Sequence, residues 1–404
     1  MQRKNGMREN MKVYFKTFGC RLNRAEALDQ EAEYASSGWE IAEKPDFADL
    51  IIVRGCSVTR RAEHDTVKTI EKLKKDFPLA QIAIEGCLPL KKKAALNSLR
   101  RQFSPPTPSA PTVPPRTSRA YLKVQDGCNG TCTYCTIPKF RGKSVSLNYE
   151  DVIGKAKRFI ESGYHEIVVT GCNLSLYANG GRRLPELVSA LASLSEDCRI
   201  RIGSLEPGIC DSEIIGAIAE NSNICRFLHI PVQSGSDRIL LAMRRTYLSD
   251  DITRLVLNAV HLVGDIALGC DLIAGFPDET ELDHLASKSL LKRLPFTNAH
   301  VFPYSERPGT LAATFPGTVP KSIRSQRARS LARLAAANRL KFAKRFVGRT
   351  VDVIIEDEEK SAGWTSHYLW FEALNRPSQP PARKSLAKFK VTAADGDTLR
   401  GTIA

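Results

Sequence analysis

Cys128-Asn-Gly-Thr-Cys132-Thr-Tyr-Cys135 is the stretch that decides the fold, because it places three thiols at CxxxCxxC spacing in one short loop. Gly127 and Gly130 leave the backbone of this loop free to curl. Iron–sulfur clusters normally take four cysteines, so a cluster held by three leaves one iron open for chemistry. An incomplete zinc site or buried structural cysteines are the alternatives, but zinc sites favour paired CxxC motifs or a nearby histidine. The spacing therefore predicts a reactive iron–sulfur site on Cys128, Cys132 and Cys135, here named the loop triad.

Three further cysteines, Cys20, Cys56 and Cys87, form a second set that we name the sheet-edge triad. Each ends a short apolar, β-favouring run closed by Gly-Cys, and helix-favouring stretches at 25–36 and 62–75 separate the runs. This βαβαβ alternation predicts parallel strands, whose carboxyl ends gather at one edge of a sheet, where ligands bind. A single such cysteine is more typical of a small buried residue. Because the pattern occurs three times, we expect these cysteines to meet and to hold a second cluster.

The chain of 404 residues is too long for one ordinary core and predicts an α/β protein of several domains. Residues 1–101 contain the sheet-edge triad, and the proline-rich stretch 102–118 predicts an extended linker. From 119 to 345 strand and helix phrases alternate, which predicts a partial parallel (β/α)6 barrel with its site at the carboxyl edge. The expected strands are Tyr121–Gln125, Glu166–Thr170, Arg199–Ser204, Phe227–Ile230, Ala267–Ile273 and Ala299–Phe302. Residues 346–404 predict a small β-barrel, with strands at Thr350–Glu356 and Lys388–Ala393, a β-prone stretch at Gly363–Glu372 and a proline-rich turn at Arg376–Pro381.

Composition indicates a globular protein in a reducing compartment. Hydrophobic residues make up 42% of the chain and charged residues 25%, and no apolar run approaches the roughly 20 residues that a membrane helix needs. The polar start lacks the apolar core of a signal peptide, so we expect no membrane, a cytoplasmic location and reduced thiols. The cysteines outside the two triads share no spacing and are expected to be packing residues; they are Cys172, Cys198, Cys210, Cys225 and Cys270.

Positive charge is concentrated in one predicted helical stretch. The net charge is +15, and residues 321–349 hold ten Lys or Arg residues and no acidic residue. A generic basic surface helix fits this pattern, and a membrane-surface helix fits less well because the stretch lacks a strong apolar face. Since nucleic acids bind positive surfaces largely through counterion release, the favoured interpretation is contact with a phosphate backbone.

Taken in order, the motifs of the chain resemble the radical S-adenosylmethionine (SAM) methylthiotransferases over nearly its whole length. The matching phrases are Phe18–Asn23, Gly55–Thr59, Glu85–Cys87, Gln125–Pro138, Arg141–Gly142, Arg201–Pro207, His229–Asp237, Asp271–Thr280 and His300–Ser305. The resemblance implies a 4Fe–4S cluster on each triad, with SAM bound at the loop triad. CxxxCxxC alone is a moderately specific signal, whereas this ordered set of motifs is very specific.

The resemblance also implies the reaction. Family members insert a methylthio group at an unactivated C–H bond, most often C2 of a modified adenosine at position 37, beside the tRNA anticodon. The cluster of the loop triad would cleave SAM reductively to a 5′-deoxyadenosyl radical, which removes hydrogen from the target carbon. The cluster of the sheet-edge triad would present the sulfur. The implied partners are the tRNA anticodon stem-loop, a reductant such as flavodoxin or ferredoxin, and a sulfur donor.

Residues at successive strand ends are candidates for contacts with SAM. Polar side chains there would hydrogen-bond the ribose or the amino group, and a Gly-Phe pair would let the adenine lie against the backbone. The candidates are Ser204, Glu206, Gln233, Ser234, Gly275 and Phe276. Each polar one fits a cap or turn about equally well, but their shared placement favours a site. Gly171-Cys172-Asn173 follows the second barrel strand, at a position that lines the pocket in the family.

The tail resembles the TRAM module, an RNA-binding barrel. Its aromatic residues either stack on unpaired bases or form the barrel core; they are Trp364, His367, Tyr368 and Trp370. The tail has no cysteine, so we expect the radical chemistry to need nothing from it. Two departures from the family pattern are Arg54-Gly55, where relatives often carry Asn-Thr, and Ser366-His367, where they commonly carry Glu-Asn.

The phrase Lys16–Ala27 most resembles the subgroup that acts on N6-threonylcarbamoyladenosine. The isopentenyladenosine subgroup and a third subgroup, which modifies an aspartate of a ribosomal protein, are the alternatives. The basic stretch 321–349 favours RNA over the ribosomal protein. A hypothesis of another class is a non-catalytic iron–sulfur RNA-binding or electron-transfer protein, which does not explain the SAM-site motifs.

Overall fold

The computed structural model describes residues 11–88, 117–209, 212–375 and 379–404. It contains two compact units, one made of the residues before 117 together with 139–141, and one made of 117–138 and 142–404. Most of the predicted linker 102–118, Cys210 and half of the predicted turn Arg376–Pro381 lie outside the described residues. No helix within the described part of the chain is long and apolar enough to cross a membrane.

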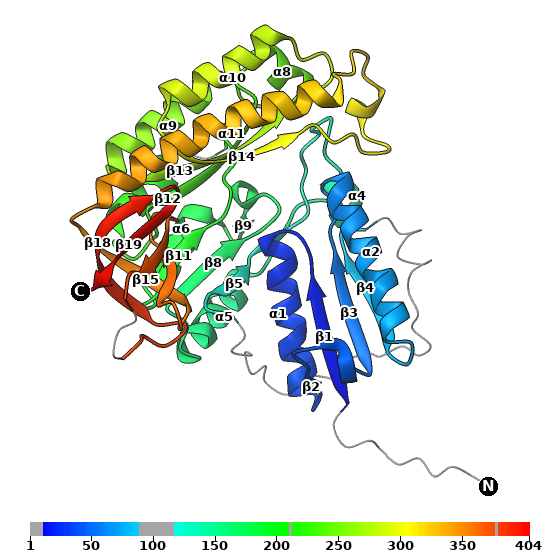
Figure 1. Cartoon of the computed structure of the whole chain (residues 1–404), viewed down its shortest axis with the longest axis vertical. Helices are drawn as coiled ribbons and strands as arrows, with labels where there is room; N and C mark the ends of the chain where they lie inside the picture. The colour runs from blue at the N-terminus through cyan, green and yellow to red at the C-terminus, as the bar shows by residue number, and fades with distance from the viewer. Residues whose placement is uncertain (1–10, 89–116, 210–211, 376–378) are drawn as a thin grey trace. The chain divides into compact units, whose positions relative to one another are not determined.

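The first unit is built on a parallel sheet in the order β2-β1-β3-β4. The strands are β1 (Lys12–Thr17), β2 (Glu40–Ile41), β3 (Leu50–Gly55) and β4 (Gln81–Gly86), and the helices are α1 (Arg21–Ser36) and α2 (Arg60–Asp76) (Figure 1). Side chains of β3 alternate between two cores: Ile51 and Val53 pack in the core that includes Ile70 of α2, and Leu50 and Ile52 pack in the core that includes Tyr34 of α1. Both faces of the sheet are therefore buried, as expected of a parallel sheet.

The second unit begins with six parallel strands. They form two three-stranded sheets, β5-β8-β11 and β12-β13-β14, which parallel bridges from Ile200 to Ile224 and from Ser204 to His229 connect. The strands are β5 (Ala120–Lys123), β8 (Glu166–Thr170), β11 (Arg199–Ile202), β12 (Phe227–Gln233), β13 (Ala267–Ala274) and β14 (Phe296–Pro303). All six lie where the sequence predicts a barrel strand, with β12, β13 and β14 longer than expected.

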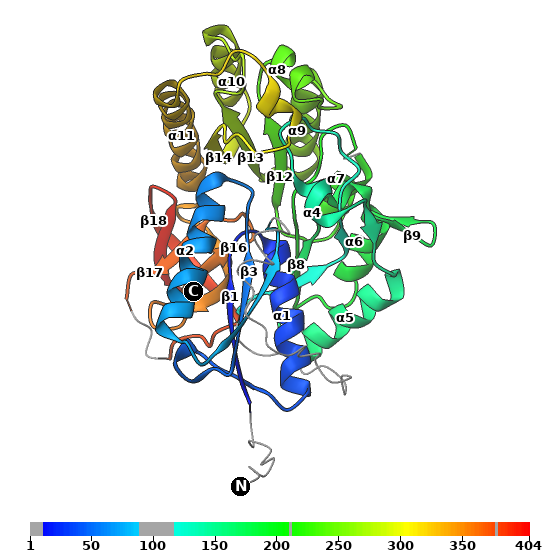
Figure 2. The ribbon, with the colours of Figure 1, turned by 90° about the vertical axis from the view of Figure 1, so that its right-hand side faces the viewer.

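Helices separate and cover these strands. They are α5 (Tyr149–Glu161), α6 (Leu184–Ala192), α7 (Ser212–Glu220), α8 (Asp237–Ala242), α9 (Ser249–Val263), α10 (Glu281–Arg293) and α11 (Lys321–Ala343). Helices α9, α10 and α11 lie along β13 and β14 (Figures 1 and 2). A short ribbon, β6 (Gln125–Asp126) with β7 (Val145–Ser146), frames the segment that contains the loop triad and the short helix α4 (Ile137–Arg141).

The tail forms a closed five-stranded barrel in the order β15-β16-β17-β19-β18. Its strands are β15 (Thr350–Asp357), β16 (Ala362–Thr365), β17 (Trp370–Ala373), β18 (Leu386–Asp395) and β19 (Thr398–Ile403). The sequence predicts the regions of β15 to β18, but the polar, glycine-containing β19 was not foreseen. Closure of the barrel removes the open edges that would otherwise invite pairing with other chains.

The tail packs closely against the six-strand part of the second unit. Val353, Phe371 and Phe389 of its barrel share one buried core with Phe227 of β12 and Phe342 of α11. Hydrogen bonds cross the same boundary, since Arg199 and Arg201 of β11 donate to backbone carbonyls of the tail. The residues involved start the barrel strands, so the tail covers the amino end of the strands, opposite the edge where the loop triad lies.

Candidate active site

The backbone around the loop triad is held in place by close contacts. The triad follows β5 and β6, and the Cys128 amide donates to the Gly142 carbonyl over 3.1 Å. Gly127 has a φ of +67°, and a Cβ at this position would lie 2.0 Å from the Lys143 carbonyl oxygen. No residue other than glycine fits there without moving the backbone. The start of the loop is therefore fixed before any cluster binds.

Backbone amides donate to two of the three sulfurs of the loop triad, which suits thiolates. The Gly130 amide donates to Cys128 Sγ at 3.3 Å and the Ile137 amide donates to Cys135 Sγ at 3.4 Å. Burial raises the pKa of Cys135 to about 11, so without a metal this thiol stays protonated. A Cβ on Gly130 would lie 3.2 Å from Cys128 Sγ and crowd that sulfur. The loop thus fits an iron–sulfur cluster, whose positive irons would offset the cost of burying thiolates.

Arg245 is a site residue that the sequence analysis missed. Its guanidinium donates to Cys132 Sγ over 3.0 Å and forms an ion pair with Glu206. It also donates to the Tyr247 hydroxyl at 2.7 Å and lies over the ring of that residue. Arg245 belongs to no matched motif, and it follows Arg244, a non-glycine residue with a positive φ of 55°. That strained turn after α8 is what directs Arg245 toward the triad, and sequence pattern alone carries no signal for it.

The predicted SAM contacts after β11 and β12 have different surroundings. Ser204 is exposed just beyond β11 and is free to face a ligand. Glu206 is half-buried; burial raises the pKa of its carboxyl, opposed by Arg245, and its backbone amide donates to the Ser175 hydroxyl at 2.9 Å. Gln233 ends β12 with a φ of 64°, a conformation that costs free energy in a residue with a side chain. These three candidates lie at the carboxyl edge, as predicted.

Ser234 and Phe276 have buried side chains. The Ser234 side chain is 1% exposed and accepts a hydrogen bond from the Ser236 amide at 3.1 Å, which is a turn role. The Phe276 ring is fully buried against Tyr304. Gly275 has a φ of 74°, and any Cβ there would collide with Arg324. Only the backbone atoms of these residues are positioned to meet a ligand.

Gly171-Cys172-Asn173 is hydrogen-bonded to the ribbon that precedes the loop triad. The Gln125 side-chain oxygen accepts from the Asn173 amide at 2.9 Å, and its amide nitrogen donates to the Gly127 carbonyl at 2.7 Å. A Cβ on Gly171 would lie 2.8 Å from that same Gln125 oxygen. Gln125 therefore links the second strand end to the loop triad. The other described cysteines outside the triads, Cys198, Cys225 and Cys270, are buried packing residues, as expected.

The sheet-edge triad gathers at the carboxyl ends of β1, β3 and β4 in the first unit. Cys56 and Cys87 are buried and Cys20 is exposed. A Cβ on Gly19, which has a φ of +95°, would lie 2.8 Å from Cys56 Sγ, so the loop before Cys20 closes directly onto Cys56. Asn23 locks this arrangement by donating to the carbonyls of Phe18 and Gly55.

An arginine also contacts the sheet-edge triad. Arg141, which belongs to the first unit, donates to Cys87 Sγ over 3.1 Å and pairs with Glu26 at 2.8 Å. Burial raises the pKa of the Cys87 thiol, and Arg141 opposes that rise. This sheet edge therefore carries the buried sulfur of Cys87, its donor Arg141 and the exposed Cys20. The set fits a cluster with one open position.

The unusual Arg54-Gly55 pair has a structural explanation. Arg54 lies between α1 and β4 and pairs with Glu26 at 2.8 Å and with Glu85. Gly55 leaves the space that Leu88 fills, since a Cβ would lie 2.4 Å from the Leu88 side chain. The pair therefore supports the loops of Cys56 and Cys87 rather than changing the ligands themselves.

Comparison with known proteins agrees with this geometry. Residues 122–290 match the radical SAM superfamily, and residues 12–104 match the uncharacterized protein family UPF0004. The threonylcarbamoyladenosine tRNA methylthiotransferase MtaB of Thermotoga maritima is 30% identical over 97% of this chain and 98% of its own length. The chain belongs to the radical SAM methylthiotransferase family.

Two further matches concern the family and the fold. The MtaB protein of Chlamydia pneumoniae, described by the same name, is 31% identical over 89% of this chain and 90% of its own. Among solved structures, the radical SAM methyltransferase TsrM from Kitasatospora setae aligns with a TM-score of 0.54 at 13% identity, covering 75% of this chain and 77% of its own. At that identity the likeness concerns the α/β fold alone.

The basic stretch of this methylthiotransferase divides into structural and exposed cations. Arg324 and Arg327 are buried, where Arg324 donates to the Tyr304 carbonyl at 3.0 Å and Arg327 pairs with Glu279 at 2.9 Å. Arg345 and Arg349 pair with Asp265, and Arg339 is half-buried beside Asn298. Seven members are exposed, of which the last two are the partners of Asp265: Lys321, Arg329, Arg333, Lys341, Lys344, Arg345 and Arg349. These seven are the members placed to meet a phosphate backbone.

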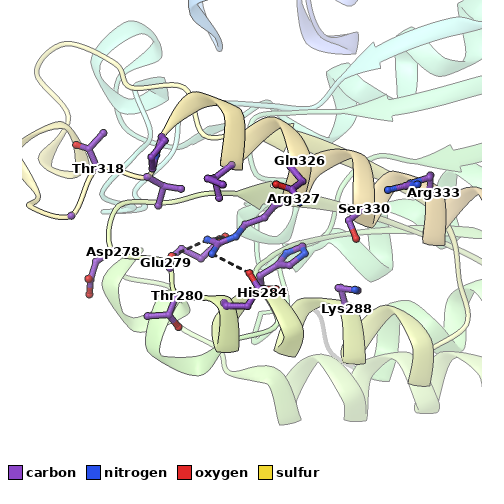
Figure 3. A pocket seen from close by; sticks show the side chains of 15 residues that line it. Asp278, Glu279, Thr280, His284, Lys288, Thr318, Gln326, Arg327, Ser330 and Arg333 are labelled. Atoms are coloured by element: carbon purple, nitrogen blue, oxygen red, sulfur yellow. Dashed lines mark hydrogen bonds and ion pairs between the residues drawn. The ribbon is translucent and has the colours of Figure 1, made fainter.

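A groove of about 790 Å³ runs between α10 and α11. Lys288 and Arg333 line one part of it and Asp278 another, so its charge is mixed (Figure 3). The Arg327–Glu279 pair lies inside it. The groove lining contains no cysteine, which separates it from the site of the loop triad.

The aromatic residues of the tail are engaged within the second unit. His367 packs on Phe346 with ring centroids 4.6 Å apart, and burial lowers its pKa to about 4. Tyr368 lies 4.8 Å from Phe227 and stacks on Trp364 at 4.6 Å. Ser366-His367, which departs from the family pattern, therefore lies in a turn that packs against the end of the radical SAM barrel. All four aromatic residues are partly buried, and the ring nitrogens of Trp364 and Trp370 donate to Glu356 and Glu372.

Proposed function

We propose that this protein is a tRNA methylthiotransferase that adds a methylthio group to C2 of N6-threonylcarbamoyladenosine at position 37, next to the anticodon. The observation that carries the proposal is the full-length match to proteins with the MtaB name, together with two cysteine triads at the carboxyl edges of two parallel sheets. A single triad suffices to cleave SAM, but transfer of a sulfur group calls for a second open iron.

Each triad would hold one 4Fe–4S cluster. The loop triad would bind the cluster that supplies the electron for reductive cleavage of SAM. Around it, Arg245 would hold Glu206 in place and keep positive charge beside Cys132, while Ser204 and Gln233 face the ligand. In the first unit, Arg141 would support Cys87, and exposed Cys20 lies on the accessible side where a sulfur group is presented.

The domains divide the work. Residues 1–101 form the domain of the sheet-edge triad, 119–345 the radical SAM barrel and 346–404 a TRAM-like barrel, with 102–118 as the linker. The exposed cations of α11, Trp364 and Trp370 are the candidate contacts to the anticodon stem-loop of tRNA. A reductant such as flavodoxin or ferredoxin and a sulfur donor complete the reaction, which we place in the cytoplasm.

Mass spectrometry of tRNA nucleosides from a deletion strain tests this function. We expect the deletion strain to lose 2-methylthio-N6-threonylcarbamoyladenosine. The wild-type gene should restore this nucleoside, and a gene with all three loop-triad cysteines changed to alanine should not. Loss of 2-methylthio-isopentenyladenosine instead would move the protein to that subgroup. Unchanged tRNA together with a missing methylthio group on a ribosomal-protein aspartate would favour the third subgroup. Absence of SAM cleavage by the reduced, reconstituted protein would favour a non-catalytic iron–sulfur protein.

A further inference from the structure

Three side chains that the proposed reaction does not use meet on neighbouring strands of the barrel. His229 of β12, Asp271 of β13 and His300 of β14 offer ligand atoms that all lie within 4.8 Å of one another. His229 Nε2 lies 3.1 Å from one Asp271 carboxylate oxygen, and His300 Nδ1 lies 3.3 Å from the other. The carboxylate thus stands between two imidazoles.

Strand register puts the three on one face of the sheet. Asp271 pairs directly with His300, and His229 pairs with Gly269, which shares the Asp271 face of β13. Cys270 and Leu272, on the opposite face, are buried at 0% and 1% exposure. Gly269 is required here, because a Cβ would lie 2.6 Å from His229 Nδ1. Because Gly269 has no side chain, the His229 ring can occupy the space next to it.

The geometry points to a binding site for one divalent transition metal ion, with His229, Asp271 and His300 as its protein ligands. Two imidazoles and one carboxylate are the ligand set of many iron and zinc sites, in which remaining positions stay open to oxygen donors. Ligands about 2.0–2.1 Å from a tetrahedral zinc ion stand roughly 3.3 Å from one another. The two nitrogen–oxygen distances, which involve opposite oxygens of the carboxylate, are close to that spacing, and one ligand atom from each residue lies within 4.8 Å of the others.

The surroundings favour a defined site. His229 is buried, Asp271 is partly buried and His300 is exposed, so an ion can enter from the His300 side. Phe302 lies edge-on to the His300 ring, and Phe227 lies beside His229. Ser204, a candidate for SAM contact, forms a backbone bridge with His229, so the metal would lie one strand from the reaction site.

The test uses full-length protein whose iron–sulfur clusters have been reconstituted, so that cluster cysteines do not compete for added metal. Zn²⁺ is titrated anaerobically against a chelating indicator, and iron and sulfide are measured in every sample. We expect one Zn²⁺ per chain beyond the clusters, with affinity reduced at least about tenfold in His300→Phe and in Asp271→Asn. His261→Ala, which removes an exposed histidine of α9, serves as the matched control and is expected to bind as wild type.

X-ray absorption at the zinc edge provides a measurement that depends on no variant. The wild-type protein is expected to show a shell of nitrogen and oxygen near 2.0–2.1 Å with imidazole scattering. A sulfur shell near 2.3 Å would assign the zinc to cysteines and overturn the proposal. Equal zinc affinity in wild type and Asp271→Asn, with iron content preserved, would show that the three side chains form only a hydrogen-bonded cluster.

Discussion

Arg201 Nε donates to Glu166 Oε1 over 2.8 Å, and both side chains are completely buried. Arg199 also pairs with Glu166, and Arg119 lies 3.8 Å from it. The same two arginines of β11 donate to tail carbonyls, for example Arg201 to Thr365 at 2.9 Å. One glutamate at the start of β8 thus pairs with both arginines that join the radical SAM barrel to the tail barrel.

Glu166→Gln is expected to destabilise the second unit by about 3–5 kcal/mol, because it leaves buried arginines without their counter-charge. Burial opposes the charge of Glu166, but the arginines outweigh it and hold the pKa below its usual range. The contribution of Glu166 is therefore complete above the unfolded carboxyl pKa of about 4.3 and is lost as the pH falls through the lower folded value. Denaturation curves of both proteins should converge only in acid; equal stability at pH 7 would contradict this assignment.

Ending the chain after Gly348 is expected to abolish SAM cleavage as well as tRNA modification. The truncation exposes Phe227 and Phe342 and removes the carbonyl partners of Arg199 and Arg201. SAM cleavage, iron content and the thermal midpoint report the effect. Lys388→Ala, at an exposed tail position, is the control and should leave all three unchanged. A truncated protein with wild-type SAM cleavage would show that the barrel stands alone.

The two triads are expected to bind iron independently. Reconstituted wild-type protein should hold about eight irons, as two 4Fe–4S clusters do. Alanine at Cys128, Cys132 and Cys135 should halve the iron and abolish SAM cleavage. Alanine at all three cysteines of the sheet-edge triad should halve the iron but leave SAM cleavage detectable. About four irons in the wild-type protein would rule out the second cluster.

Arg245→Gln is expected to slow SAM cleavage by at least about tenfold while the iron content is preserved. The substitution removes the positive charge beside Cys132 and frees Glu206, but it leaves every cysteine in place. Arg245→Lys keeps the charge without the planar donor geometry and should restore part of the rate. Loss of iron in both variants would make Arg245 a structural support of the loop and not a positioning residue.

Charge reversal of Arg329, Arg333 and Lys344 to glutamate is expected to weaken tRNA binding, and more so at low salt. These residues are exposed on α11 and the short helical turn after it, whereas Arg339 is half-buried and unsuited to the test. The same reversal at Lys68, Lys72 and Lys75 of α2 matches the change in net charge. Affinities measured at two salt concentrations separate the two sets, because salt screens the phosphate contribution. Equal losses in both variants would show that only overall charge matters.

Much of the candidate site could be predicted because its signals are local. The spacing of Cys128, Cys132 and Cys135 places three ligands in one loop, whatever the rest of the chain does. The repeated Gly-Cys ends needed one added step, that parallel strands end at a common edge. Arg245 escaped prediction since its direction depends on the turn at Arg244 and on a sulfur more than 100 residues away.

The amino-acid sequence by itself determined the six barrel strands, the two cysteine triads and the family. These follow from periodicity and ligand spacing, which act over a few residues at a time. Tertiary structure alone decided that Arg324 and Arg327 are buried supports, that His367 and Tyr368 pack against the barrel, and that His229, Asp271 and His300 meet. Such partnerships join residues far apart in the chain; Arg199 and Trp364, for example, are 165 positions apart. A polar or aromatic side chain can contact water, RNA or a buried partner, and only the packing of the folded chain determines which of these it contacts.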